Sequence, residues 1–240
     1  MIRKHPFVVG TIHHIYNRGA VKLPICKEKA DYWRFIQGLC LFNDTESTSS
    51  ILWRLERDRG RLSMNVLKKY ILSFKKKRKN LVNILAYCVM DNHYHLLLEE
   101  VREGGITQFM HKFGTGYSKY FNNKYEREGS LCQNIFKNIL VDNENYLLYL
   151  LVYINVLNPL DLIELNWKEK GIKQSIKKIL KHTEQYQFSS HLDHSDKRNS
   201  LILNKNSIKK IIPDSDFYFD LVNSVLYEKK YEEIEHLVLE

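Results

Sequence analysis

Residues 81–100, LVNILAYCVMDNHYHLLLEE, decide the fold of this 240-residue chain. Two runs rich in strand-forming residues, 81–90 and 93–98, flank the turn signal Asp91-Asn92. Apolar runs of this length on either side of a turn are typical of a β-hairpin. The stretch therefore predicts two largely buried, neighbouring strands.

The second predicted strand opens with two histidines. Side chains two residues apart point to the same face of a strand, so His93 and His95 could hold one divalent cation while Tyr94 points into a core. The alternative is a pair of histidines that are hydrogen-bonded or solvated, with no metal. Two polar rings at the mouth of a buried strand are costly unless something binds them, which favours the metal site.

Four stretches, in the same order along the chain, resemble one protein family. Residues 86–98, AYCVMDNHYHLLL, resemble the His-hydrophobic-His segment of the single-tyrosine HUH transposases, the insertion-sequence-200-like group that includes the REP-associated tyrosine transposases. The other matches are HIYNRG at 14–19, the pieces at 120–122, 129–131 and 136–137, and the pieces at 153–154 and 158–159. Together they span about residues 7–160, and an ordered set is more specific than any one match.

The resemblance implies a catalytic tyrosine, Tyr153, on a helix predicted at 143–157. It also implies a site for Mg²⁺ or Mn²⁺ formed by His93, His95 and Asn158. For Tyr153 the alternative is a half-buried tyrosine that packs a hydrophobic helix and has no catalytic role.

The spacing between Tyr153 and Asn158 departs from the family pattern. In the family the asparagine follows the tyrosine by four residues, which places both on one helical face. Here it follows by five, a rotation of about 100° in a regular helix. A π-bulge could restore the register, Asn155 or another group could serve as the ligand, or the site has decayed.

Composition and charge restrict the class of partner. The chain is 44% hydrophobic, as globular proteins are, and its net charge of +9 indicates a polyanion, either nucleic acid or an anionic membrane surface. No apolar run is long enough to span a membrane and the first residues lack a signal-peptide core, so we expect a cytoplasmic protein of the bacterial cytosol or nucleoid. Nucleic acid is then the favoured partner. The scattered cysteines predict reduced, buried thiols: Cys26, Cys40, Cys88 and Cys132.

The order of predicted elements indicates an α+β fold. A strand at 7–17, a helix at 27–42, the hairpin, a helix at 106–125 and a strand at 129–141 form a ferredoxin-like antiparallel sheet with helices on one face, as the resemblance also implies. We expect a catalytic domain at 1–160 with a basic helical insertion at 43–80, and an accessory, helical C-terminal region at 161–240. The helical spacing of aromatics in 106–125 favours a core over a base-stacking surface.

Basic residues outside the core are candidate nucleic-acid contacts, the alternative being solvated charge. The candidates are Arg18, Lys75, Lys76, Lys77, Arg78, Lys79, Lys119, Lys124, Arg127 and Lys137. Relatives usually carry arginine where this chain has Ile135, so one phosphate contact is expected to be missing.

Three functions remain open at this level. The first is a metal-dependent transposase that nicks and rejoins single-stranded, hairpin-forming DNA through a covalent phosphotyrosine, with a homodimer left open. The second is a catalytically decayed, domesticated DNA-binding protein of the same family. The third is an RNA-binding protein, although no RNP-like aromatic motif is present.

Overall fold

A four-stranded antiparallel sheet forms the centre of the protein, and its strand order is β2-β3-β1-β4. The computed structural model describes residues 6–46, 67, 68, 71 and 78–228. The strands are β1 Ile12–Arg18, β2 Val82–Val89, β3 His93–Glu100 and β4 Lys137–Val141. The predicted hairpin is confirmed, since β2 and β3 pair directly with Val89 opposite Tyr94.

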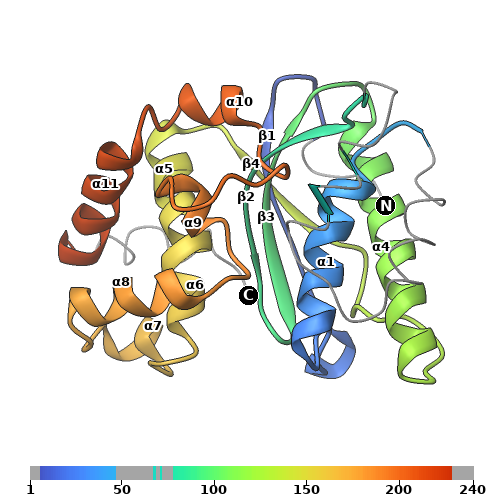
Figure 1. Ribbon diagram of the computed structural model, residues 1–240, viewed down its shortest axis with the longest axis horizontal. Helices are drawn as coiled ribbons and strands as arrows, with labels where there is room; N and C mark the ends of the chain where they lie inside the picture. Colours follow the sequence, from blue (N-terminus) through green and yellow to red (C-terminus); the bar gives the residue numbers. More distant parts are fainter. Residues whose placement is uncertain (1–5, 47–66, 69–70, 72–77, 229–240) are drawn as a thin grey trace.

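Two helices cover one face of this sheet, as predicted. They are α1, Lys29–Leu41, and α4, Gly105–Lys124, and Figure 1 shows both on the same side of the strands. α1 begins with a capping box between Glu28 and Asp31. The buried Glu100 carboxylate accepts hydrogen bonds from the backbone N–H groups of Gly105 and Ile106, at 2.9 and 2.7 Å, and so caps α4. With the chain order β1-α1-β2-β3-α4-β4, the ferredoxin-like topology is confirmed.

The aromatic residues of α4 are structural, as predicted. Phe109, Phe113 and Tyr117 are buried in the core between the helices and the sheet. The Phe113 ring lies 4.7 Å from that of Phe35 on α1, measured between centroids. These rings are therefore not available to stack on bases.

The other face of the sheet is covered by the segment after β4. It starts with α5, Glu144–Val152, a π-helix, Tyr153–Leu157, and α6, Asn158–Leu160. The predicted C-terminal helical extension follows as α7 Trp167–Lys170, α8 Ile176–Gln185, α9 His191–His194, α10 Lys205–Lys209 and α11 Ser215–Glu228. A second hydrophobic core lies between these helices and the sheet. Helices thus cover both faces, because α5 and the π-helix pack onto the face that the fold prediction left uncovered.

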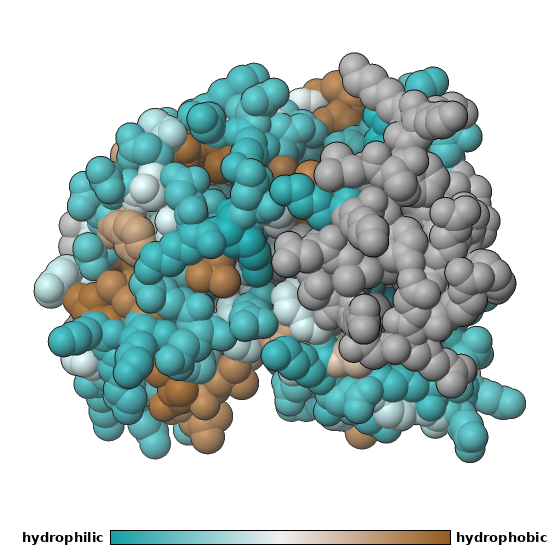
Figure 2. All heavy atoms as spheres, in the orientation of Figure 1, coloured by the Kyte–Doolittle hydropathy of each residue, from teal (hydrophilic) through white to brown (hydrophobic). Residues whose placement is uncertain are grey.

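The C-terminal region also covers an edge of the sheet. The N–H of Val89 donates to the carbonyl of Phe188 at 3.1 Å, and the N–H of Ser190 donates to the carbonyl of Tyr87 at 2.9 Å. Backbone groups at the outer edge of β2 are therefore paired within the chain. Figure 2 shows a surface that is mostly hydrophilic on this side of the molecule, with smaller hydrophobic areas.

Some predicted boundaries were too wide. The strand expected at 129–141 is regular only over Lys137–Val141, and a short 3₁₀ turn, Ala20–Lys22, follows β1. Within the predicted C-terminal region, Gly171 has a φ of 72° and ends α7, which separates α7 from α8.

The described ends of the predicted insertion are fastened to the core. Asn43 accepts hydrogen bonds from the N–H groups of Leu81 and Val82 at 2.9 and 3.0 Å, which fixes the entry into β2. The Arg78 guanidinium donates to the Asp44 carboxylate at 3.1 Å and to the Cys40 carbonyl at 2.6 Å. Arg78 was predicted to contact nucleic acid. Its donors are engaged within the protein, and its contact with nucleic acid stays a prediction.

Two further sequence predictions can be compared with the structure. All four cysteines are free thiols, three of them buried and Cys132 partly buried. Within the described residues, none of the helices combines the length and the apolar character that crossing a membrane requires.

Candidate active site

His93 and His95 share one face of β3, as the strand periodicity predicts. Their rings meet edge to face with centroids 5.3 Å apart. His95 is buried, whereas His93 is partly exposed at the start of the strand. Tyr94 points to the opposite face, into the core below α1 and α4. The face that carries the histidines is the one covered by α5 and the π-helix.

The π-helix compensates for the extra residue between Tyr153 and Asn158. In it the N–H of Asn158 donates to the carbonyl of Tyr153, five residues back instead of four. The wider turn keeps both residues directed at the strand. Asn158 Oδ1 lies 3.0 Å from His93 Nε2, and the Tyr153 ring lies 5.4 Å from the His95 ring, between centroids. Of the three possibilities raised by the sequence, the π-bulge is the one found.

The contacts of His93 suit a metal ion. Its Nδ1 lies 2.7 Å from Asn92 Oδ1 and its Nε2 lies 3.0 Å from Asn158 Oδ1. A neutral imidazole has one N–H, so it can donate to only one of these two acceptor oxygens. A cation between Nε2 and Oδ1 would instead be bound by both.

His14 supports His95 from the neighbouring strand. Its Nε2 lies 2.8 Å from His95 Nδ1, because β1 and β3 pair with Tyr16 opposite His95. Burial lowers the pKa of His14 to about 3. Burial, together with the charges of His14 and His93, also holds the pKa of His95 well below its usual value. If Nδ1–H of His95 donates to His14, its Nε2 keeps the lone pair that a metal requires.

His14 was missed as a site residue, although it belongs to the first matched stretch. The sequence shows that His13 and His14 face opposite sides of β1, but which of them meets His95 depends on strand pairing. Among the described residues, no group of three His, Cys, Asp or Glu side chains is placed to hold a metal. The two imidazoles and the amide that the resemblance predicts as metal ligands lie next to one another. That they hold a metal stays a prediction.

Tyr153 is 1% exposed and packs between His95 and the C-terminal region. The Lys168 ammonium, on α7, lies 3.4 Å from its hydroxyl oxygen and 5.5 Å from the centre of its ring. Lys168 was not predicted as a site residue. It is fifteen residues from Tyr153 along the chain, and a local sequence pattern does not show a contact between residues so far apart.

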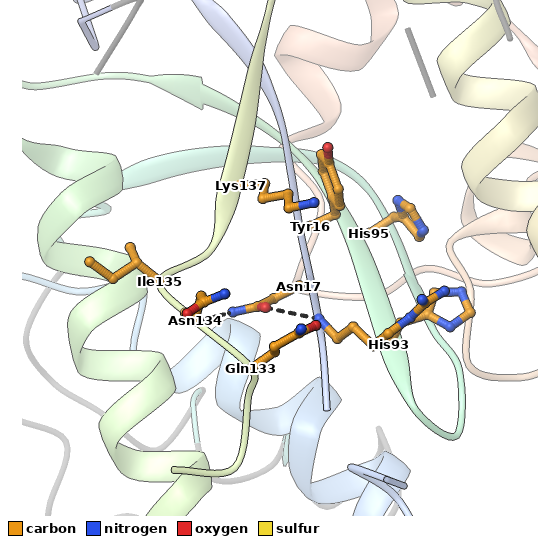
Figure 3. Close-up of a pocket in the computed structure, with 9 residues that line it drawn as sticks. Tyr16, Asn17, His93, His95, Gln133, Asn134, Ile135 and Lys137 are labelled. Atoms are coloured by element: carbon orange, nitrogen blue, oxygen red, sulfur yellow. Dashed lines mark hydrogen bonds between the residues drawn. The ribbon is translucent and has the colours of Figure 1, made fainter. Parts of the chain in front are cut away.

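A pocket opens beside the histidines (Figure 3). His93, His95, Tyr16 and Asn17 contribute to its wall, together with Gln133 and Asn134 from the loop before β4. Two predicted nucleic-acid contacts, Arg18 and Lys137, also line it. At the same pocket Ile135 is 72% exposed, in the position where relatives carry arginine.

The remaining predicted basic residues are not brought to this pocket. Lys119, Lys124 and Arg127 belong to α4 and the turn after it, on the opposite face of the sheet. The Lys124 ammonium lies 2.6 Å from the Glu28 carboxylate and also pairs with the buried Asp31, so it has a structural role. Its contact with nucleic acid stays a prediction. Lys79 is exposed, whereas residues 75–77 lie outside the described part of the chain.

The sequence was compared with known proteins. Residues 47–155 match the profile of the family described as "Transposase IS200 like". This match agrees with the resemblance to IS200-like transposases that the sequence motifs predict. The range that matches the IS200-like family includes His93, His95 and Tyr153 and ends before Asn158 and Lys168.

Curated proteins and solved structures add one similar protein. No curated protein matches the sequence significantly. One similar solved structure is described as a REP-associated tyrosine transposase bound to a REP hairpin. It is 13% identical, the alignment covers 85% of this chain and 93% of that chain, and the TM-score is 0.45.

Proposed function

We propose that this IS200-like protein is a metal-dependent transposase that nicks and rejoins single-stranded DNA through a covalent phosphotyrosine. One observation carries the proposal. The π-helix brings Asn158 within 3.0 Å of His93 while Tyr153 stays against His95, despite the extra residue. This arrangement keeps the residues that the proposal needs together, in spite of the changed spacing.

In this proposal His93, His95 and Asn158 hold Mg²⁺ or Mn²⁺. When bound, the ion would polarise the scissile phosphodiester. His14 fixes the orientation of the His95 ring through the hydrogen bond between their nitrogens. Tyr153 supplies the nucleophilic oxygen, and its ester with the DNA phosphate conserves the energy of the broken bond for rejoining.

The pocket beside the histidines would receive the DNA strand. Arg18 and Lys137 line it and could contact phosphates, and the net charge of +9 favours a polyanion. The pocket lies where β1 ends and where β3 and β4 begin. We extend the proposal to hairpin-forming element ends as the substrate, and to a catalytic domain at 1–160 followed by an accessory region at 161–240.

The test is covalent capture of DNA. The protein is incubated with a labelled single-stranded oligonucleotide and Mn²⁺, and adducts that survive denaturation are counted. We expect an adduct with the wild-type protein and none with Tyr153→Phe, which removes one oxygen and keeps the ring packing. Binding of the oligonucleotide should be unchanged. Tyr149→Phe is the matched control, since Tyr149 is also buried on this helix, with its ring 6.3 Å from that of Tyr153.

Two outcomes would contradict the proposal. An adduct that survives Tyr153→Phe would place the nucleophile elsewhere, and peptide mapping would locate it. Binding without any adduct, in wild-type protein whose fold is intact, would favour the decayed DNA-binding descendant. Loss of Mn²⁺-dependent capture in His93→Ala and His95→Ala would support the metal site.

A further inference from the structure

We propose that Lys168, in the C-terminal extension, is part of the catalytic machinery and stabilises the charge on the oxygen of Tyr153. This inference rests on the proposed function. Lys168 lies outside residues 47–155, which match the family, and outside the stretches that resemble it. A catalytic role for Lys168 would therefore make the extension part of the active site.

The first support is geometric. The Lys168 ammonium donates to the Tyr153 hydroxyl oxygen at 3.4 Å and also lies 5.5 Å from the centre of the ring. These two contacts place the Lys168 ammonium beside the hydroxyl end of the Tyr153 ring. The neighbours of Tyr153 include the His95 ring, the Tyr149 ring and Lys168. Of these three, Lys168 is the cation.

The second support is that the local fold holds Lys168 in place. Its neighbour Trp167 is 1% exposed, and the indole N–H donates to the Asp161 carboxylate. On the other side of α7, the Glu164 carboxylate accepts hydrogen bonds from the N–H groups of Lys173 and Gln174 at 2.7 and 3.1 Å. The turn that presents Lys168 is therefore anchored at both ends.

The third support is chemical. In the reaction a bond forms between the Tyr153 oxygen and phosphorus, and the bond from phosphorus to the leaving sugar oxygen breaks. The phenol proton passes to solvent, and the leaving oxygen takes a proton from water. Negative charge is present on the Tyr153 oxygen before attack, and again when the ester is broken during rejoining. A fixed ammonium beside that oxygen stabilises both states, as preorganised donors do in other active sites.

The experiment compares Lys168→Met with Lys170→Met. Methionine keeps the length of the side chain and removes its charge, and Lys170 is an exposed lysine on the same short helix. We expect Lys168→Met to slow adduct formation by about 100-fold, the order seen when one donor to a reacting oxygen is removed. Affinity for single-stranded DNA should not change, Lys168→Arg should retain most of the rate, and Lys170→Met should match the wild type. Ethylammonium ions should partly restore Lys168→Ala, which a purely structural role would not allow.

A second readout does not need activity. With fluorotyrosine incorporated, the ¹⁹F resonance that disappears in Tyr153→Phe reports the surroundings of this ring. It should shift in Lys168→Met and stay in place in Lys170→Met. Equal adduct rates for Lys168→Met and wild type would overturn the inference while leaving the proposed function intact. If the wild type forms no adduct, it is the proposed function that fails. In that case, a Tyr153 resonance at the same position in Lys168→Met and in wild type would show in addition that Lys168 does not contact the Tyr153 ring.

Discussion

Acid should destabilise this protein in part through two buried histidines in the C-terminal extension. His191 and His194 lie on α9, 0% and 4% exposed, against the ring of Tyr218. Burial lowers the pKa of each to about 4, from an ordinary value of 6.5. Between these two values the unfolded chain binds protons that the folded protein does not. Stability is therefore complete above about pH 6.5 and is lost as the pH falls toward 4.

The size of the effect follows from the difference in pKa. At pH 5 an unfolded histidine is mostly protonated while the buried one is mostly neutral. This costs about 2 kcal/mol for each ring, or about 4 kcal/mol for both, in the free energy of unfolding. Such a loss is a large part of the stability of an ordinary domain.

Urea unfolding at pH 8 and pH 5 measures this loss. His194→Gln should lose about 2 kcal/mol less than the wild type over this pH change, whatever its stability at pH 8, since one titrating ring is gone. His111→Gln is the control, because His111 is exposed on α4, and it should lose as much as the wild type. Equal losses for wild type and His194→Gln would refute the reasoning.

Two further predictions concern the core and the pocket. Phe113→Ala should lower the free energy of unfolding by roughly 3 to 5 kcal/mol, because the ring is 2% exposed and packs on Phe35; reduced DNA binding at full stability in denaturant titrations would contradict its core role. Ile135→Arg should strengthen binding of single-stranded DNA and steepen its dependence on the logarithm of salt concentration by about 0.7, the value for one added phosphate contact. An unchanged slope would show that the exposed position does not face the DNA backbone.

Local patterns were sufficient to predict much of the fold. The alternation of residues in β3 gave the shared face of His93 and His95, and the 3.6-residue spacing in α4 gave Phe113 as a core residue. Both patterns depend only on the geometry of a single element. For the same reason the order of elements was enough to indicate the ferredoxin-like topology.

The features that were missed depend on contacts between distant segments. The contact of His14 with His95 needs the register of β1 against β3, and that of Lys168 with Tyr153 needs the path of the chain after α6. From the sequence, the π-helix was one of three explanations for the spacing between Tyr153 and Asn158, and the sequence did not decide among them. The wider turn of the π-helix is set by where Tyr153 and Asn158 must pack, and a helix-forming sequence does not specify this.

The outer edge of β2 donates a hydrogen bond to the Phe188 carbonyl and accepts one from the Ser190 N–H, which limits how this protein can associate with others. An open edge strand can recruit a strand from another molecule, which is a common route to dimers and to aggregation. Because β2 is already paired with its own chain there, intermolecular strand pairing along the sheet is directed to the opposite edge, at the five-residue β4. The C-terminal extension therefore hinders the addition of a strand from another molecule at the β2 edge of the sheet.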